Sequence, residues 1–538
     1  MRDHKDSCVY QIYIKSFCDS NGDGIGDIPG ITGKLDYIKS LGVEYIWITP
    51  FFRSPLNDNG YDVSDYRNID PVFGTMEQLE ELIAEADKRG IGLMLDMVFN
   101  HTSTEHEWFR RALAGEEKYI NYYKFVDGGP DSPPTNWESK FGGSAWEYVP
   151  RLGKWYLHLF DVSQADLNWD NPEVRAELED ILRFWKRKGI KGFRFDVINL
   201  VSKPDCWEND SEGDGRRFYT DGPRIHEYIK ELVEGGGIAD MLTVGEMSST
   251  TIDNCVRYSN PNEKELSMCF SFHHLKVDYE NGDKWTLMRP DLGKLKKLLT
   301  DWQLGMQEGG GWNAVFWCNH DQPRAVSRFG DDKRYRKESA KMLAGMIHLL
   351  RGTPYIFQGE EIGTTNAGFT DISQYRDVES LNYYDIMLRK GKTREEALAV
   401  LAAKSRDNGR TPMQWTDGKN AGFTEGEPWI GLPDNYRDIS VAEAEKDPDS
   451  ILSFYRELIA LRKKYDIIAD GSFEPVETPD NMFVYRRRLD GQALTVMCNL
   501  TETPADAGTL PEGGLLICNY GGERGGTLAP YEFRAYLK

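Results

Sequence analysis

The chain has 538 residues, of which 40% are hydrophobic and 28% charged, and this composition excludes disordered, coiled-coil and collagen-like chains. Its 65 Lys and Arg against 87 Asp and Glu give a net charge of −22, so we expect no nucleic-acid and no membrane partner. The eight cysteines form no CxxC pair and no run reaches the roughly 18–20 apolar residues of a membrane span, which favours a cytoplasmic protein.

Short apolar runs bounded by turns alternate with segments of helical period along most of the chain. Residues 75–90 give the clearest helical pattern, since Thr75 and Gln78 form a capping box and Gly90 ends the segment. Eight apolar runs are candidate strands: 8–17, 43–50, 92–100, 192–198, 241–247, 266–272, 313–321 and 353–359. Eight alternations of strand and helix predict an α/β fold, a (β/α)8 TIM barrel.

Two segments fall outside this alternation. Residues 102–169 are rich in Trp, Gly, Pro and Tyr and lack a clean repeat, so we interpret them as a domain inserted after the third strand. From residue 465 to residue 538 the chain changes to short strand-like runs with Gly and Pro turns, which predicts a C-terminal antiparallel β domain. Residues 1–101 and 170–464 then form the catalytic barrel.

Several predicted strands end in acidic residues. Asp196, Glu246 and Asp321 each stand where a barrel strand meets its loop, and two carboxylates that face one cleft are what glycoside hydrolysis requires. Arg194 would keep Asp196 ionised, whereas Glu246, on a mostly apolar strand end, would stay protonated and act as the acid. A single acid in such a place is usually a helix cap or a surface ion pair, but three at separate strand ends predict a catalytic site.

The segments around these acids resemble the α-amylase family of glycoside hydrolases in order and spacing. The matching segments are 96–101 (DMVFNH), 192–196 (GFRFD), Glu246 and 316–321 (FWCNHD), and 164–169 (QADLNW) resembles the marker of its oligo-1,6-glucosidase branch. The resemblance implies a retaining double displacement in which Asp196 is the nucleophile, Glu246 the general acid/base and Asp321 a stabiliser of the transition state. It also implies that the sugar subsite is lined by His101, Arg194 and His320.

Three further positions match those with which related exo-acting glucosidases close the pocket around a terminal glucose: Asp58, Tyr61 and Arg406. On residue type alone, Tyr61 is more often a core aromatic and Arg406 a surface ion pair. The assignment therefore depends on the resemblance, which implies cleavage at the end of the substrate.

Residues 19–27 form a loop that is rich in oxygen ligands. Asp19, Asn21, Asp23 and Asp27, with the carbonyl of Ile25, copy the front half of an EF-hand loop, but Gly30 stands where a bidentate Glu would close it. Relatives in this branch bind Ca²⁺ with such a loop, so the resemblance implies one structural Ca²⁺, with Mg²⁺ as a substitute, and no organic cofactor. A metal-free turn rich in Asp and Asn is the alternative.

A basic group follows the strand of the acid/base in this acidic chain: His273, Lys276 and Lys284. Such donors would bind a phosphate through charge-assisted hydrogen bonds, although a core histidine and solvated lysines are the commoner interpretation. Segments 134–146, 212–224 and 245–251 also resemble the phosphotrehalases of this branch. That resemblance implies hydrolysis of a disaccharide phosphate, trehalose 6-phosphate, to glucose and glucose 6-phosphate. We expect a monomer or weak oligomer.

Other functions compete with this interpretation. An oligo-1,6-glucosidase or dextran glucosidase would share the three acids. A catalytically inactive barrel that serves as a binding module would need a membrane span and can lose the carboxylates, whereas this chain retains all three. A glucosyl transferase or sucrose isomerase differs only in what attacks the glucosyl-enzyme, so some transfer stays open.

Overall fold

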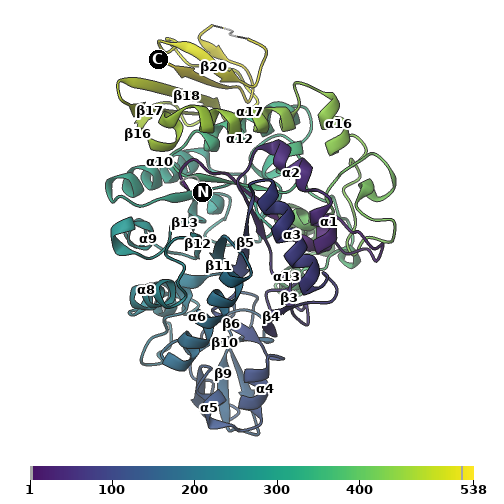
Figure 1. Ribbon diagram of the computed structural model, residues 1–538, viewed down its shortest axis with the longest axis vertical. Helices are drawn as coiled ribbons and strands as arrows, with labels where there is room; N and C mark the ends of the chain where they lie inside the picture. The colour runs from purple at the N-terminus through teal and green to yellow at the C-terminus, as the bar shows by residue number, and fades with distance from the viewer. Residues whose placement is uncertain (1–3, 523–524) are drawn as a thin grey trace.

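The computed structural model describes residues 4–522 and 525–538 (Figure 1). Eight parallel strands close a barrel in the order β1, β2, β5, β11, β12, β13, β14 and β15. Their bounds are Val9–Ile12, Tyr45–Ile48, Gly92–Met97, Gly192–Phe195, Leu242–Met247, Met268–Ser271, Asn313–Val315 and Thr353–Phe357. Each predicted apolar run contains one of these strands, so the (β/α)8 barrel is confirmed.

A helix follows each barrel strand and covers the outside of the barrel (Figure 1). These helices are α2 (Leu35–Leu41), α3 (Met76–Lys88), α6 (Pro172–Arg187), α8 (Ile225–Gly235), α9 (Ile252–Ser259), α10 (Leu292–Glu308), α12 (Arg336–His348) and α17 (Ile451–Lys464). The predicted capping box of α3 is present, with Thr75 accepting from the Gln78 backbone and Gln78 accepting from Thr75. The buried face of α3 consists of Leu79, Leu82, Ile83 and Ala86, which is the spacing of one apolar stripe.

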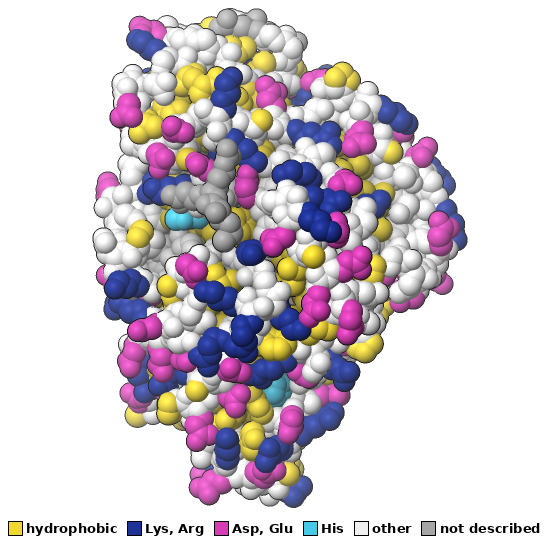
Figure 2. All heavy atoms as spheres, viewed as in Figure 1, with side chains coloured by type: hydrophobic (Ala, Val, Ile, Leu, Met, Phe, Trp, Pro, Cys, Tyr) yellow, Lys and Arg dark blue, Asp and Glu magenta, His cyan; other side chains and the backbone are white. Residues whose placement is uncertain are grey.

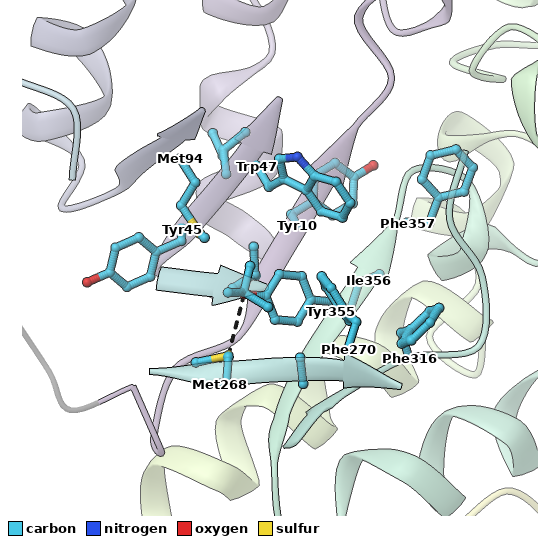
Figure 3. Packing of buried hydrophobic residues seen from close by; sticks show 14 of the residues in the cluster. Tyr10, Tyr45, Trp47, Met94, Met268, Phe270, Phe316, Tyr355, Ile356 and Phe357 are labelled. Carbon is cyan, nitrogen blue, oxygen red and sulfur yellow. Dashed lines mark hydrogen bonds between the residues drawn. The ribbon is translucent and has the colours of Figure 1, made fainter. Parts of the chain in front are cut away.

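The inside of the barrel is filled by side chains rather than open (Figure 3). Phe270 packs edge-on against Tyr355, with ring centroids 4.6 Å apart, and tilted against Trp47 at 5.8 Å. Such a packed interior leaves the C-terminal ends of the strands as the place for a binding site.

Residues after β5 leave the barrel and form the lower part of Figure 1. Strand β6 (His101–Ser103) pairs with β10 (Gln164–Asp166), and between them lie α4 (Glu107–Leu113), α5 (Glu117–Ile120) and a small antiparallel sheet. That sheet consists of β7 (Phe125–Asp127), β9 (Lys154–Leu157) and β8 (Trp146–Val149). The pair β6–β10 therefore joins this inserted part to the rim of the barrel.

A second excursion, which the sequence pattern did not separate from the barrel, lies between β15 and α17. It contains α13 (Val378–Arg389), α14 (Arg394–Lys404), α15 (Asp407–Arg410) and α16 (Val441–Lys446). The two-stranded sheet of β3 (Phe52–Arg53) and β4 (Asp65–Ile69) follows β2. Both segments supply residues to the site described below.

The C-terminal part is an antiparallel sheet beyond α12 and α17 (Figure 1). Its strands follow the order β16 (Ser472–Val476), β17 (Met482–Leu489), β18 (Gln492–Asn499), β22 (Phe533–Leu537) and β20 (Gly514–Cys518), with β19 (Ala505–Asp506) paired to β21 (Thr527–Leu528). Gly345 of α12 lets the sheet approach, because a Cβ there would lie 2.6 Å from the ring of Phe533. The predicted antiparallel sheet is confirmed.

The outer surface shows acidic and basic side chains interspersed on the face of Figure 2. Among the described residues, no helix is both long and apolar enough to cross a membrane.

Candidate active site

The three acids lie at the C-terminal end of the barrel, as the strand pattern predicts. Asp196 directly follows β11, and its backbone N–H donates to the carbonyl of Met97 at 3.0 Å. Glu246 lies in the neighbouring strand β12. Val197, next to Asp196, has a φ of 34°, a left-handed conformation that a β-branched residue adopts only under strain. This sharp turn ends β11 and leaves Asp196 on the rim.

One buried guanidinium joins the acids of the two strands. Arg194 donates from Nη1 to Oδ1 of Asp196 at 2.7 Å, and its Nη2 contacts Oε2 of Glu246. The apolar surroundings that we expected for Glu246 are therefore wrong, because its nearest partner is a cation. The two carboxyl groups are therefore held on one guanidinium, from neighbouring strands.

Behind this pair lies a third carboxylate, Asp96 of β5. Its oxygens accept from Arg194 Nη1 at 2.6 Å, from the Tyr61 hydroxyl at 2.8 Å and from Trp47 Nε1 at 3.1 Å. Burial raises the pKa of Asp96 to about 7, even though Arg194 opposes the shift. Asp96 thus fixes the side chains of Arg194 and Tyr61 from below the site.

Asp321 lies between two arginines and His320. Its Oδ1 lies 3.1 Å from Nη1 of Arg406 and 3.0 Å from Nη2 of Arg410, and its Oδ2 lies 3.1 Å from Nε2 of His320. Burial alone would raise the pKa of Asp321, but these three neighbours lower it well below its ordinary value. Asp321 is therefore ionised, as a stabiliser of developing positive charge must be.

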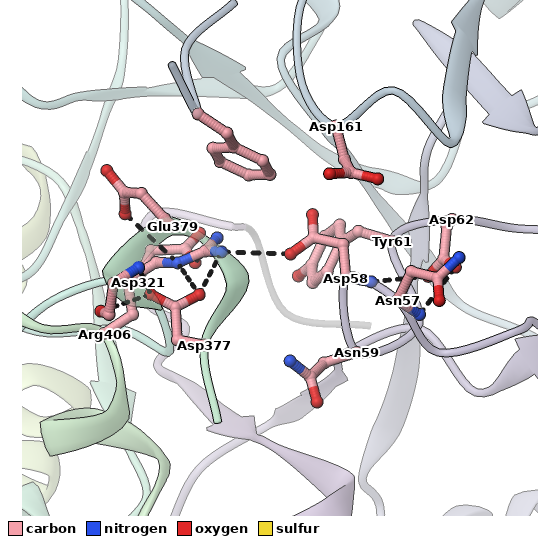
Figure 4. Close-up of polar contacts among 12 residues, drawn as sticks. Asn57, Asp58, Asn59, Tyr61, Asp62, Asp161, Asp321, Asp377, Glu379 and Arg406 are labelled. Atoms are coloured by element: carbon pink, nitrogen blue, oxygen red, sulfur yellow. Dashed lines mark hydrogen bonds and ion pairs between the residues drawn. The ribbon is translucent and has the colours of Figure 1, made fainter. Parts of the chain in front are cut away.

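A network of ion pairs closes the far side of the pocket (Figure 4). Arg406 lies between Asp58 and Asp377, with its Nη2 3.1 Å from Asp58 Oδ1 and 2.5 Å from Asp377 Oδ1. Burial raises the pKa of Asp58 to about 7, against the opposing effect of Arg406. This wall joins the segment between β3 and β4 to the excursion after β15.

Aromatic and imidazole rings line the same pocket. Tyr61 and His320 stack in parallel, 5.0 Å between centroids and 1° between planes. The Nε2 of His101 lies 3.1 Å from the Tyr61 carbonyl, and Gln164 reaches from β10 to within 3.2 Å of the same nitrogen. The structure thus brings together all the sugar-subsite residues that the resemblance implies, from five separate segments.

Two members of this site were not predicted. Asp377 and Arg410 complete the network around Arg406 and Asp321. Arg410 lies four residues after the predicted Arg406, so the same stretch of sequence could have indicated it. Asp377 is the N-cap of α13, and the sequence around it contains no motif that indicates a role in the site.

The three predicted basic residues have different surroundings. His273 packs against Trp302 with centroids 5.1 Å apart, and burial lowers its pKa to about 4, so it is neutral. Lys284 donates to Oε2 of Glu379 at 2.7 Å. Lys276 lies 3.5 Å from the hydroxyl of Ser249 and forms no ion pair with any described residue. Only Lys276 of the three is a cation without a counter-ion.

The 19–27 loop supplies oxygen donors, which suits a hard cation. However, these oxygens already accept hydrogen bonds: Asp19 Oδ1 from Asn21 and Gly22, Asn21 from Asp23, and Asp23 from Ile25. Asp27 accepts from Gly30 at 2.7 Å as the N-cap of α1 (Ile28–Thr32), and from Ser20. In the part of the chain that the structure describes, no three His, Cys, Asp or Glu side chains converge as metal ligands. Calcium binding stays a prediction.

A parallel barrel with one acid directly after β11, a second on β12 and a third, ionised acid beside them has the arrangement of a glycoside hydrolase. The family of α-amylase catalytic domains matches residues 11–471, so the chain belongs to the α-amylase family. It is 56% identical to the trehalose-6-phosphate hydrolase of Bacillus subtilis (strain 168), over 94% of this chain and 91% of that protein. It is 46% identical to the oligo-1,6-glucosidase of Parageobacillus thermoglucosidasius, over 99% and 98%. The crystal structure of Bacillus licheniformis trehalose-6-phosphate hydrolase superposes with a TM-score of 0.94 at 53% identity, over 99% of each chain.

Proposed function

We propose that this glycoside hydrolase cleaves trehalose 6-phosphate to glucose and glucose 6-phosphate. The observation that carries the proposal is Lys276, a cation without a counter-ion beside the loop that follows Glu246, in a chain of net charge −22. A phosphate on the leaving sugar would supply that counter-ion. The names of the two trehalose-6-phosphate hydrolases that this chain matches at 56% and 53% identity support the same substrate.

The chemistry follows from the strand ends. Asp196 attacks the anomeric carbon of the terminal glucose while Glu246 protonates the glycosidic oxygen, and glucose 6-phosphate leaves. Glu246 then takes a proton from water, which attacks the glucosyl-enzyme and releases glucose with its configuration retained. The ionised Asp321 stabilises the positive charge that develops on the sugar ring in both steps.

The ion-paired wall of Asp58, Arg406 and Asp377 supports exo action, because it joins two segments across one end of the site. Glucose is neutral, and these ion-paired side chains offer it hydrogen-bond partners that hold one another in place. We therefore assign the unsubstituted glucose to this end and the phosphorylated sugar to the open end near Lys276.

The deciding experiment compares kcat/KM for trehalose 6-phosphate, trehalose and isomaltose in the same buffer. The proposal predicts that trehalose 6-phosphate is preferred over both. If isomaltose is preferred, the chain is an oligo-1,6-glucosidase or dextran glucosidase. The 46% identity to an oligo-1,6-glucosidase is the observation that keeps this second candidate.

Two further properties belong to the proposal. A sugar phosphate is charged and does not cross a bilayer unaided, so we place the activity in the cytoplasm. The all-oxygen donor set of residues 19–27 supports a structural Ca²⁺, for which the hydrogen bonds within the loop would have to be shared with the ion.

A further inference from the structure

A second lysine without a counter-ion lies in the same region as Lys276 but comes from the inserted domain. Lys140, in the segment between β7 and β8, has its Nζ 3.4 Å from Oγ of Ser248. Lys276, after β13, has its Nζ 3.5 Å from Oγ of Ser249. Two cations from segments far apart in the sequence therefore meet at neighbouring serines, two and three residues beyond Glu246.

Neither lysine forms an ion pair with a described residue, which is unusual among the buried lysines near this site. Lys203 lies 2.7 Å from Asp166, and Lys284 lies 2.7 Å from Glu379. Charged groups taken out of water are normally paired, because an unpaired charge loses its hydration without compensation. Lys140 and Lys276 can thus each form an ion pair with an anion that is not part of the described protein.

The serines between them are held rigidly. The backbone N–H of Ser248 donates to Oδ1 of Asn199 at 2.9 Å, and Nδ2 of Asn199 donates to the Ser248 carbonyl at 2.8 Å. Ser249 has a φ of 54°, a left-handed conformation that is uncommon for a residue other than glycine. Each hydroxyl oxygen faces a lysine, so each hydroxyl hydrogen is available to donate to an anion.

The electrostatics agree with an anion site. Burial lowers the pKa of Lys140 to about 7, and the nearby cations Arg216, Lys276 and Lys203 lower it further, against one acid, Asp214. Burial, followed by Arg216, lowers the pKa of Lys276 to about 8. A bound dianion would reverse both shifts, so its binding is coupled to full protonation of the two lysines.

From these contacts we infer that Lys140 is a specificity-determining residue that binds the phosphate of the leaving sugar together with Lys276, Ser248 and Ser249. The inference rests on the proposed function for the identity of the substrate. It extends the phosphate site beyond the segment after Glu246 to the inserted domain. Because Glu246 protonates the oxygen of the leaving sugar, the loop just beyond it borders that sugar and no other part of the substrate.

The test replaces Lys140 with Met, which keeps the stem and removes the charge, and with Arg, which keeps the charge. Lys154→Met, a lysine of β9 paired with Asp127, is the control from the same inserted domain. The readout is the ratio of kcat/KM for trehalose 6-phosphate to that for an uncharged aryl α-glucoside. We expect Lys140→Met to lower this ratio roughly ten- to hundredfold, through KM more than kcat, since that is the range for a charged hydrogen bond. Lys140→Arg should restore most of it, and melting curves show that each variant is folded.

A second measurement separates this inference from the proposed function. Glucose 6-phosphate and glucose are compared as inhibitors of aryl α-glucoside hydrolysis. If the wild type prefers isomaltose but glucose 6-phosphate inhibits more strongly than glucose, and Lys140→Met removes the difference, the proposed function is wrong and the anion site stands. If the wild type prefers trehalose 6-phosphate and Lys140→Met leaves both ratios unchanged, the proposed function stands and Lys140 is not part of the site. If the wild type prefers isomaltose and glucose 6-phosphate inhibits no better than glucose, both are wrong.

The pH dependence gives a readout that a merely structural role would not produce. The phosphate is a dianion above pH ~6, and at the anion site the groups with a pKa between 6.5 and 8.5 are Lys140 and Lys276. Asp58 and Asp96 also titrate near pH 7, but they serve every substrate, so the pH profile for the aryl α-glucoside is subtracted as their contribution. We expect the wild-type KM for trehalose 6-phosphate to rise above pH 7 as Lys140 loses its proton in the free enzyme. In Lys140→Arg this rise should move upward, toward the pKa of Lys276. The same pH profile in both enzymes would contradict the inference.

Discussion

The two ends of the active site hold their charges in opposite ways. At the closed end, Arg406 contacts Asp58, Asp377 and Asp321, and Arg410 contacts Asp321 as well, so every charge has a partner. At the open end, Lys140 and Lys276 lie near the hydroxyls of Ser248 and Ser249, and neither forms an ion pair with any residue that the structure describes.

This difference follows from what each end would bind. A neutral sugar is held by hydrogen bonds, and ion-paired side chains present donors and acceptors in fixed positions. A dianion binds best to cations that have no counter-ion within the protein. Such a site is less stable while it is empty, because it then holds buried positive charge without a partner. On this proposal, the ion-paired side chains bind the unsubstituted glucose, and the two lysines bind the phosphate of the other sugar. The predictions below separate these two roles.

The largest losses are expected at the strand ends between the two regions. Asp196→Asn removes the nucleophile and Glu246→Gln the proton donor, so each should abolish turnover of trehalose 6-phosphate, with losses of about 10²–10⁴-fold or more. On an activated aryl glucoside, whose leaving group needs no proton, Glu246→Gln should form the glucosyl-enzyme far faster than Asp196→Asn. Burst kinetics and mass spectrometry of the intermediate measure this, and equal losses on that substrate would show that the roles are divided incorrectly.

Arg406→Lys tests the closed end. Lysine keeps the positive charge, but its single ammonium cannot replace the guanidinium that contacts Asp58, Asp321 and Asp377 together. Loss of two charged hydrogen bonds, about 1.5–3 kcal/mol each, predicts a fall in kcat/KM of roughly two to four powers of ten. Because the terminal glucose is common to all substrates, trehalose 6-phosphate and an aryl α-glucoside should fall together. The exposed Arg389→Lys is the control. A loss confined to the phosphorylated substrate would contradict this assignment, because it would show that Arg406 acts on the phosphorylated sugar and not on the terminal glucose.

Lys276→Ala tests the open end and should act selectively. One charged hydrogen bond contributes about 1.5–3 kcal/mol, so the ratio of kcat/KM for trehalose 6-phosphate to that for the aryl glucoside should fall roughly ten- to hundredfold. Added salt should lower the wild-type ratio in the same direction, because an ionic contact at an open cleft is screened. Lys297→Ala, an exposed lysine on α10, is the control. Equal loss on both substrates would mean that Lys276 is structural.

His273 should matter less than the lysines, because burial lowers its pKa to about 4 and it carries no charge near neutrality. His273→Gln removes at most a neutral hydrogen bond, so we expect only a two- to tenfold loss on trehalose 6-phosphate, roughly 0.5–1.5 kcal/mol. The ratio of wild-type to variant kcat/KM should stay constant from pH 7.5 to 5.5. If that ratio rises as the pH falls through 6.5, the imidazole is protonated in the site and contributes charge.

The sequence pattern was sufficient for the barrel because period-2 strands and period-3.6 helices alternate in it with few interruptions. The three acids and Arg194 were predictable for the same reason: each stands at a strand end, and strand ends of a parallel barrel meet on one rim. Arg410 stands four residues after Arg406 and was available to the same argument.

Partners that lie on excursions were not predictable. Asp377 meets Arg406 from the start of α13, and Glu379 meets Lys284 from 95 positions along the chain. The expected apolar environment of Glu246 was wrong because a strand pattern shows which side chains share a face but not that one guanidinium spans both acids. Lys140 lies in a loop without periodicity, and only the folded chain shows that it reaches Ser248.

The smallest effect on activity is expected from removal of Ca²⁺, because the 19–27 loop contributes no side chain to either end of the site. It packs instead against residues 423–428, where Thr424 donates to Asp19 at 2.5 Å and a Cβ on Gly24 would lie 1.9 Å from the Glu427 carbonyl. A cation that binds only the folded chain at a hundred times its Kd stabilises it by about 2.7 kcal/mol. Chelation should therefore lower the Tm, with restoration on adding Ca²⁺, while kcat/KM at room temperature changes little.

Asp23→Ala removes an exposed predicted ligand whose Oδ1 accepts from the Ile25 N–H, and it should abolish the Ca²⁺ dependence of the Tm. An unchanged Tm in excess chelator, with no metal found by elemental analysis, would contradict the prediction. The loop would then be a metal-free turn that is stabilised by the hydrogen bonds of Asp19, Asn21 and Asp27.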